Sequence, residues 1–389
     1  MVVVSAWEPW RRPDAANLVL REQLSRLAGR HEISVLAAGA DRSVGDVPAA
    51  ALAELPNLDL EWFGTARSAG LDRLARLAWS WRTREPAHVR YVARPQLMAV
   101  LRRRAASGVD VLHLHGWGTA GLWRAAPSVP TIHAAIDPWA VNLRNRRVGT
   151  AARLSDIGQR TLIQRHERRH YPRHRAVVVV TGSDAARVRR LAPAARVDVV
   201  PNGVDLGAEP QPVPDVATLG FHGAFESQAN VDAARTLVRD VLPRVRTALP
   251  QVRVLLAGRQ PPPEIRRMAD ASVDVMADVD DVRTALDVMS VHVDWFTSGA
   301  GLKNKVLEAM AAGRPVVTNQ LGSAGIGEGD GVAVAPDLDA AAAEIVRLLR
   351  DRGLLAAVGR AGRRRAASEF SWDANADRLD QLWHEAAGR

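Results

Sequence analysis

The chain contains no cysteine, few aromatic residues and no long apolar run. The absence of cysteine from all 389 residues excludes disulfides, thiolate zinc sites and cysteine nucleophiles, so any metal would need histidine and carboxylate ligands. No apolar run approaches the roughly 20 residues that span a bilayer, and Met1–Val4 lacks the charged start and long apolar core of a signal peptide. We therefore expect a cytoplasmic protein.

Lysine is almost absent as well. Of the 52 basic residues only Lys303 and Lys305 are lysines, and both lie in a glycine-rich stretch, 298–313, that opens a predicted helix. A helix N-terminus presents unpaired backbone N–H groups and a positive dipole end, and a lysine ammonium beside it suits a phosphate. The stretch is a candidate anion site, unless the two lysines merely lie on a solvated helix start.

Length and charge indicate two parts with different partners. A chain of 389 residues is too long for one ordinary core, which predicts two domains. The net charge of +9 is concentrated in the first half, whereas 206–389 is mildly acidic. An anionic membrane surface, an anionic acceptor or nucleic acid would suit the basic half, and so would a solvated arginine-rich surface with no partner.

Short apolar strands alternate with amphipathic helices along both halves. This rhythm predicts an α/β fold of two Rossmann-like, doubly wound parallel sheets, with ligands at the carboxyl ends of the strands and a cleft between the domains. The predicted strands are 32–37, 109–115, 131–135, 176–181, 217–221, 252–257, 291–295, 315–318 and 332–334. The predicted helices are 18–27, 231–246, 340–349, 354–367 and 372–387.

Three prolines within 206–217 predict a linker. We expect an N-terminal domain at 1–205 and a C-terminal domain at 218–370. A terminal helix at 371–389 could pack back on the N-terminal domain.

Several motifs follow one another in an order that is more specific than any one of them. Together they resemble the retaining glycosyltransferases of family 4, which have the GT-B fold, over residues 15–385. The motifs are VVPNGVD at 199–205, GLKNKVLEAMAAG at 301–313 with PVVT at 315–318, HEISV at 31–35, DVLHLH at 110–115, TIH at 131–133 and ADVDDV at 277–282. The resemblance implies transfer of a sugar from a nucleoside-diphosphate sugar to an acceptor, with retention of anomeric configuration.

The donor diphosphate is expected at the start of the helix after Gly301. Asn304 could cap a helix from Lys305 to about Ala312, with Gly313 in the left-handed stop position. The diphosphate would then meet backbone N–H groups of Gly301, Leu302 and Asn304, with Lys303 and Lys305 as equal candidates for the phosphate contact that stabilises the leaving group. This arrangement requires no metal. The alternative for Lys305 is a salt bridge to Glu308 on the same helix face.

The resemblance assigns further donor contacts. Glu308 matches the second glutamate of a paired motif, which accepts both ribose hydroxyls, but the first glutamate is replaced by Ala300. The family's loop arginine after the first strand of the second domain is missing around Gly223. Ala277 and Val279 match the loop that lines the nucleotide base through backbone groups.

His133 matches the histidine that faces the sugar and the acceptor, and we expect it at a strand end; the alternative is a structural histidine. His113 and His115 are weaker candidates, and Asp137 could orient either of them.

Two metal-like patterns are rejected. His166-Glu-Arg-Arg-His170 fits the zinc signature H-E-x-x-H, but it lies on a polar arginine-rich helix and has no clear third ligand. Asp278-Val-Asp280 fits a D-x-D metal pattern, but it falls in the expected base-binding loop. We therefore expect no metal site and no cofactor apart from the donor substrate.

The N-terminal region departs most from the family. Trp7–Asp14 is bulky and basic where the family has a glycine-rich turn. Leu71–Arg82 predicts a basic amphipathic helix whose tryptophans could meet a membrane surface peripherally, although packing against its own sheet is the favoured interpretation.

The sequence thus predicts a glycosyltransferase acting on a small-molecule, glycan or lipid-linked acceptor. The alternative is a non-catalytic sugar-nucleotide or glycan-binding relative, because Ala300 and the missing arginine depart from the family. A nucleic-acid binder ranks last, since no interleaving of basic and aromatic residues suggests a base-stacking platform.

Overall fold

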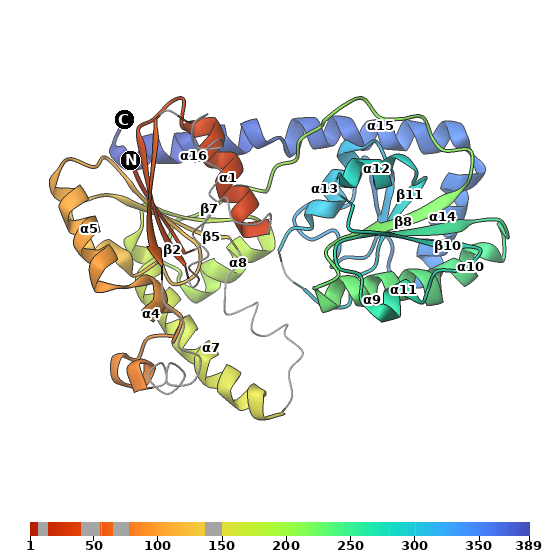
Figure 1. Ribbon diagram of the computed structural model, residues 1–389. Helices are drawn as coiled ribbons and strands as arrows, with labels where there is room; N and C mark the ends of the chain where they lie inside the picture. Colours follow the sequence, from red (N-terminus) through yellow and green to blue (C-terminus); the bar gives the residue numbers. More distant parts are fainter. Residues whose placement is uncertain are drawn as a thin grey trace. The chain divides into compact units, whose positions relative to one another are not determined.

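The computed structural model describes residues 1–6, 15–39, 55, 57–64, 78–136, 150–279, 281–299 and 301–389. These form two compact units (Figure 1). Unit 1 comprises Met1–Pro201 with Asn375–Arg389, and unit 2 comprises Asn202–Ala374. Each unit contains one parallel sheet, which confirms the prediction of two Rossmann-like domains.

Among the described residues, the sheet of unit 1 has seven strands in the order β3-β2-β1-β4-β5-β6-β7. The order reverses between β1 and β4, as in doubly wound folds. The strands are β1 (Val2–Ser5), β2 (Ile33–Gly39), β3 (Leu58–Gly64), β4 (Leu112–His115), β5 (Thr131–Ile136), β6 (Ala176–Val179) and β7 (Val197–Val199). Its helices include α1 (Ala15–Leu27), α4 (Val89–Val92), α5 (Pro95–Ala106), α7 (Thr150–His170), α8 (Gly182–Leu191) and α16 (Trp372–Ala387), with short 3-10 turns at Leu122–Ala125 and Tyr171–Arg173.

Helices cover both faces of this sheet. On one face, Leu24 of α1 and Trp383 of α16 share a core with Ile132. On the other face, Leu101 of α5 packs with Leu114. The C-terminal helix therefore completes the core of the first sheet, although it follows the whole of unit 2 in the sequence.

The sheet of unit 2 has six strands in the order β10-β9-β8-β11-β12-β13, with the same reversal between β8 and β11. The strands are β8 (Thr218–His222), β9 (Arg253–Gly258), β10 (Val273–Ala277), β11 (Val291–Asp294), β12 (Val316–Thr318) and β13 (Val332–Val334). The helices are α9 (Gln228–Thr236), a π-helical turn (Leu237–Val241), α10 (Leu242–Arg246), α11 (Pro263–Arg266), α12 (Val282–Asp287), α13 (Asn304–Ala311), α14 (Leu338–Arg350) and α15 (Arg352–Glu369).

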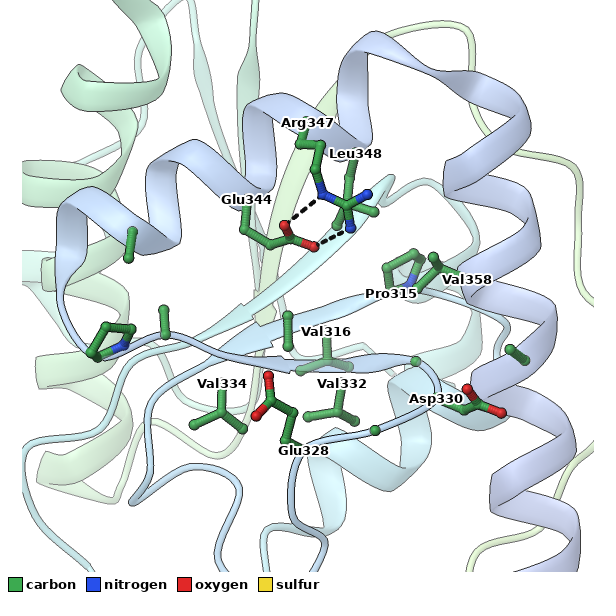
Figure 2. Close-up of a pocket in the computed structure, with 17 residues that line it drawn as sticks. Pro315, Val316, Glu328, Asp330, Val332, Val334, Glu344, Arg347, Leu348 and Val358 are labelled. Atoms are coloured by element: carbon green, nitrogen blue, oxygen red, sulfur yellow. Dashed lines mark hydrogen bonds and ion pairs between the residues drawn. The ribbon is translucent and has the colours of Figure 1, made fainter.

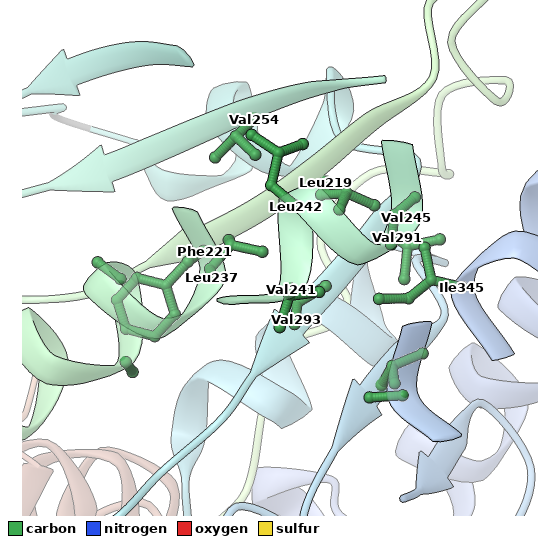
Figure 3. Close-up of a cluster of buried hydrophobic side chains, with 14 of the residues drawn as sticks. Leu219, Phe221, Leu237, Val241, Leu242, Val245, Val254, Val291, Val293 and Ile345 are labelled. Carbon is green, nitrogen blue, oxygen red and sulfur yellow. The ribbon is translucent and has the colours of Figure 1, made fainter. Parts of the chain in front are cut away.

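The main core of unit 2 lies on one face of its two central strands (Figure 3). Phe221 of β8 and Val293 of β11 pack there with apolar residues of α9, α10 and α14. The alternate positions point to the opposite face, because side chains alternate along a strand. They carry His222, His292 and Asp294, all of which are buried. Parallel strands covered on both faces are normally apolar throughout, so these polar residues need an explanation.

Residues 206–217, predicted as a linker, belong to unit 2 and pack against it. Arginines hold this segment through its backbone carbonyl groups. Arg314, only 1% exposed, donates to Gln211, and Arg352 donates to Val213. The boundary between the units falls at 201/202, and the return to unit 1 falls at 374/375.

Part of the N-terminal prediction lies outside the described residues: Trp7–Asp14, 71–77 and Asp137. Trp81 is 86% exposed, so the favoured packing of this tryptophan against its own sheet is wrong. Contact with a membrane surface stays a prediction. Across the described parts of the chain, none of the helices has both the length and the apolar character needed to cross a membrane.

Candidate functional site

The residues predicted for the diphosphate and the ribose meet where the strand order of unit 2 reverses, at the carboxyl ends of β8 and β11. Open α/β sheets bind ligands at such switch points, because the neighbouring crossovers leave on opposite faces and open a crevice. His222 ends β8, Asp294 ends β11, and α13 begins ten residues after Asp294.

The helix after Gly301 differs in detail from the prediction. α13 begins at Asn304, and Lys303 is the N-cap residue without a side-chain capping bond. Capping by Asn304 is therefore wrong, and its Oδ1 instead accepts a 2.8 Å hydrogen bond from Nδ2 of Asn202. Gly313, with φ of 68°, does adopt the predicted left-handed conformation.

Lys305 lies between the starts of two helices. Its Nζ donates to Oδ1 of Asn230 in α9 at 2.9 Å and lies 4.8 Å from the ring centre of Phe296. A Cβ at position 223 would come within 3.2 Å of Lys305 Cε and 3.0 Å of Asn230 Nδ2, so the absence of a side chain at Gly223 gives this lysine its room. Burial lowers the pKa of Lys305, while the charges of Asp294 and Glu308 oppose that shift.

Lys303 approaches the same aromatic ring. Its Nζ lies 5.5 Å from the ring centre of Phe296 and donates to the carbonyl of Gly301 at 3.0 Å. The chain's only two lysines are thus gathered around one phenylalanine at the start of α13. Leu302 follows Gly301 directly and precedes the helix.

Glu308 pairs with a histidine rather than with Lys305. Its Oε2 lies 2.7 Å from Nε2 of His222, and Nδ1 of His222 lies 2.9 Å from Nε2 of His292. Behind them, Nδ1 of His292 lies 3.9 Å from Oδ2 of Asp294. These four residues form a row, called the relay below, from the helix to the end of β11.

Burial governs the charges along the relay. It raises the pKa of Asp294 to about 6, against the opposing charges of Lys305 and His222. It also lowers the pKa of His292 well below its ordinary range. Burial raises the pKa of Glu308 as well, but the hydrogen bond from His222 and the charges of His222 and Lys305 bring it below the ordinary value. Glu308 is therefore the end of the row at which the protein favours the ionised carboxylate.

Sequence reasoning missed the two histidines and Asp294. The available signal was the alternation of polar and apolar residues in two strands predicted to be buried, GFH at 220–222 and VHVD at 291–294.

The predicted base-binding residues lie at the same edge of the sheet but two strands away. Ala277 ends β10, and Val279 follows after Asp278, a non-glycine residue with φ of 52°. Asp278 ties this loop to the end of β9, since its N–H donates to Gly258 at 2.8 Å and its Oδ1 accepts from the N–H of Gln260 at 2.7 Å. The predictions for Ala300 and Asp280 fall outside the described residues.

His133 does not occupy a strand end. It is the third residue of β5 and only 2% exposed, with Nδ1 3.0 Å from the carbonyl of Leu114 and its ring 5.2 Å from that of Tyr171. Burial lowers its pKa well below the ordinary range. The expected position was wrong because the strand continues to Ile136. A catalytic role for His133 stays a prediction that this burial does not favour.

The other two histidines of the first half are also buried. His113 accepts a 3.1 Å hydrogen bond from Nε1 of Trp383, and burial lowers its pKa to about 3. His115 ends β4 and is 1% exposed.

The H-E-x-x-H pattern does have a potential third ligand. Glu85, His166 and His170 each offer a ligand atom within 4.8 Å of the others. Two contacts disfavour a metal there. Nε1 of Trp123 donates to Nδ1 of His170, and Nη2 of Arg124 lies 3.1 Å from its Nε2, so both ring nitrogens already face N–H groups. Arg124 lies 3.6 Å from Glu85 and already supplies a cation to this cluster.

A cavity of about 540 Å³ lies elsewhere in unit 2, beside the edge strand β13 (Figure 2). Glu344 and Arg347 of α14 form an ion pair at 2.7 Å above it, and Glu328 and Asp330 line its other side. None of the predicted donor residues lines this cavity.

Comparisons with known proteins agree with the order of the motifs. Residues 16–208 match the model of Glycosyltransferase Family 4, and residues 216–351 match the model of Glycosyl transferases group 1. No curated protein sequence matches the chain significantly.

Similar solved structures include three of two proteins that the chain matches over almost the whole length of both partners. Sucrose-phosphate synthase from Thermosynechococcus elongatus has a TM-score of 0.66 at 17% identity, over 99% of this chain and 98% of that one. Anabaena Alr3699/HepE in complex with UDP has a TM-score of 0.69 at 14% identity, over 99% of both chains. The complex of the same protein with UDP-glucose has a TM-score of 0.66 at 14% identity, again over 99% of both chains.

At these identities the structural likeness shows the GT-B fold alone. The two family models carry the activity, since they match consecutive parts of the chain in the order of the predicted motifs. The chain belongs to the family-4-like glycosyltransferases.

Proposed function

We propose that unit 2 binds a nucleoside-diphosphate sugar at the carboxyl ends of β8 and β11, and that the enzyme transfers the sugar with retention and without a metal. The observation that carries this proposal is the gathering of Lys303 and Lys305 around Phe296 at the start of α13, one turn before the ionised Glu308.

The two lysines suit a diphosphate leaving group. Negative charge grows on the diphosphate as its bond to the sugar breaks, so fixed cations beside it stabilise the transition state more than the ground state. The backbone N–H groups at 301–304 add the positive end of α13. Because these groups supply the positive charge, the reaction needs no divalent ion in this scheme.

Glu308 suits the ribose. Its side chain is 33% exposed although its partner His222 is only 4% exposed, so a ligand can reach the carboxylate. A carboxylate has about four lone-pair sites, and His222 uses one of them, which leaves acceptors for two vicinal hydroxyls. Ala277 and Val279 would meet the base through backbone groups. The complexes of Anabaena Alr3699/HepE make UDP and UDP-glucose the first ligands to try.

The proposal is tested by binding. UDP-glucose at about a hundred times its dissociation constant adds about 2.7 kcal/mol to stability, which a thermal-shift measurement detects. The double variant K303A/K305A is expected to lose this stabilisation. The control variant R244A/R253A removes two exposed arginines of the same unit and should keep it. Unchanged binding by K303A/K305A would show that the lysines do not hold the diphosphate.

Turnover separates the enzyme from a non-catalytic relative. Incubation with UDP-, TDP- and GDP-sugars and candidate acceptors is expected to release the nucleoside diphosphate, with the α-anomer formed from an α-donor and with full activity in EDTA. Binding without release under any combination would favour the non-catalytic alternative, which the residue Ala300 motivates.

A further inference from the structure

The strongest feature that the proposed function leaves unexplained is the buried part of the relay. His292 and Asp294 are fully buried, and His222 nearly so, in strands whose other face is apolar. Burying polar groups costs free energy unless they are hydrogen-bonded, and apolar side chains would fill this space at lower cost. A function at the exposed end of the row would account for that cost.

The distances indicate where the protons lie when both imidazoles of the row are neutral. Three gaps separate Glu308, His222, His292 and Asp294, and they measure 2.7, 2.9 and 3.9 Å. In the state in which both imidazoles are neutral, each carries one N–H, so two protons can fill two of the three gaps. The short gaps are the filled ones. His292 Nε2–H therefore donates to His222 Nδ1, and His222 Nε2–H donates to Glu308.

The unfilled gap lies at the buried end. Nδ1 of His292 and both oxygens of Asp294 lack hydrogen-bond partners within the described parts of the chain. An imidazole without a proton on Nδ1 must carry it on Nε2, so an unprotonated Nδ1 on His292 sets the tautomer of the whole row. The reverse tautomer would turn a bare Nε2 of His222 toward the carboxylate of Glu308 and repel it.

We propose that His222 is a positioning residue that orients Glu308 for the ribose hydroxyls of the donor, with His292 fixing its tautomer. The proposal rests on the proposed function. His222 holds Oε2 of Glu308 by a 2.7 Å hydrogen bond, which leaves the lone pairs of Oε1 as acceptors for a ligand. The row thus selects nucleotides that carry both ribose hydroxyls.

The test compares two nucleotides by calorimetry, UDP and 2′,3′-dideoxy-UDP, which lacks both hydroxyls. H222L is expected to bind UDP about tenfold more weakly, since a hydrogen bond to a charged group contributes about this factor, and to bind the dideoxy compound as the wild type does. H222Q keeps an N–H near the position of Nε2 and should recover most of the UDP affinity. V293A, a buried change on the apolar face of β11, is the control that perturbs the strand without the relay.

Each outcome bears on a different statement. If H222L loses affinity equally for UDP and for the dideoxy compound, which is the pattern expected of V293A, His222 only supports the fold. An unchanged UDP affinity in H222L would also overturn the proposal. If the wild type binds neither nucleotide, the donor site itself is wrong, and if it binds both equally, the ribose contact of Glu308 is wrong.

A measurement on the wild type covers the case in which H222L does not fold. Imidazole ¹⁵N spectra should show His222 with a proton on Nε2 and an unprotonated Nδ1. The opposite tautomer would overturn the proposal without any substitution.

Discussion

Replacing Asp294 by asparagine is expected to stabilise unit 2 at neutral pH. Asp294 is fully buried, and its two carboxylate oxygens have no hydrogen-bond partner within the described residues. Burial raises the pKa of this carboxyl from the ordinary 3.8 to about 6 despite the positive charge of Lys305 nearby. The folded protein therefore carries, at neutral pH, an ionised carboxylate that burial disfavours relative to the unfolded state.

The size of the effect follows from proton linkage. A rise of the pKa from 3.8 to about 6 corresponds to about 3 kcal/mol between the two protonation states. The folded state binds the proton more tightly than the unfolded state. The stabilisation that the protonated carboxyl of Asp294 gives the folded state is therefore fully present below about pH 4. It is lost as the pH rises through about 6 and stays lost above that. Asparagine has no charge to bury, so D294N should gain about 3 kcal/mol over the wild type between pH 4 and 7.

Hydrogen exchange of the β8 and β11 peptides, followed against urea at several pH values, measures this difference within unit 2. D274N, which changes an exposed carboxylate on β10, is the matched control and should show little pH-dependent difference. A difference between D294N and the wild type that is the same at pH 4.5 and pH 7.5 would refute the reasoning, because Asp294 would then titrate normally in the folded state.

Three further changes have definite expected outcomes. G223A places a Cβ within 3.2 Å of Lys305, so UDP-glucose affinity should fall about tenfold by calorimetry while the melting temperature changes little; unchanged affinity would show that the lysine need not occupy this position. E85Q removes the carboxylate that holds His166 at 2.5 Å, and thermal unfolding should show a loss of about 3 kcal/mol at pH 7.5. Burial raises the pKa of Glu85, but the hydrogen bond and charge of His166 outweigh burial and bring this pKa below its ordinary value. The loss of stability in E85Q should therefore become smaller as the pH falls into the acid range. A loss that is the same at every pH would contradict the ion pair. D337A removes the N-cap of α14, which accepts from Ala340 at 2.8 Å, and should cost about 1 kcal/mol in urea unfolding, whereas no loss would mean that the cap is replaced by solvent.

The fold could be predicted because its signals are local. Apolar runs of four to six residues between helical patterns identified most strands, and the helix at 372–387 was predicted with the bounds that α16 has. The chain's return to the first sheet through α16 depends on contacts between residues more than 200 positions apart, such as the hydrogen bond from Trp383 to His113. Such a contact has no local signal, and the sequence could only suggest it as a possibility.

The errors in the site arose where a distant partner overrode a local rule. Asn304 satisfies the composition rule for an N-cap, but Asn202 binds its side chain, so the helix starts one residue earlier than expected. Glu308 and Lys305 have the spacing of a helical ion pair, yet each is held by a residue outside the helix, His222 and Asn230. Spacing within a helix shows which residues are neighbours on its surface, but not what the opposing strand offers to each of them.

The residues that surround a helix position also explain why this arginine-rich chain has lysine at position 305. Arginines elsewhere in unit 2 use their planar forks to donate to backbone carbonyls, as Arg314 does to Gln211 and Asp287. At position 305 the side chain is bounded by Gly223, Asn230 and the ring of Phe296. The space is narrow, because a Cβ on residue 223 would lie only 3.2 Å from Cε of the lysine. A compact ammonium on a flexible stem fits there and keeps N–H groups for the proposed diphosphate, whereas a rigid guanidinium needs a wider space. The shape of the switch point between β8 and β11, as well as the need for charge, therefore favours lysine.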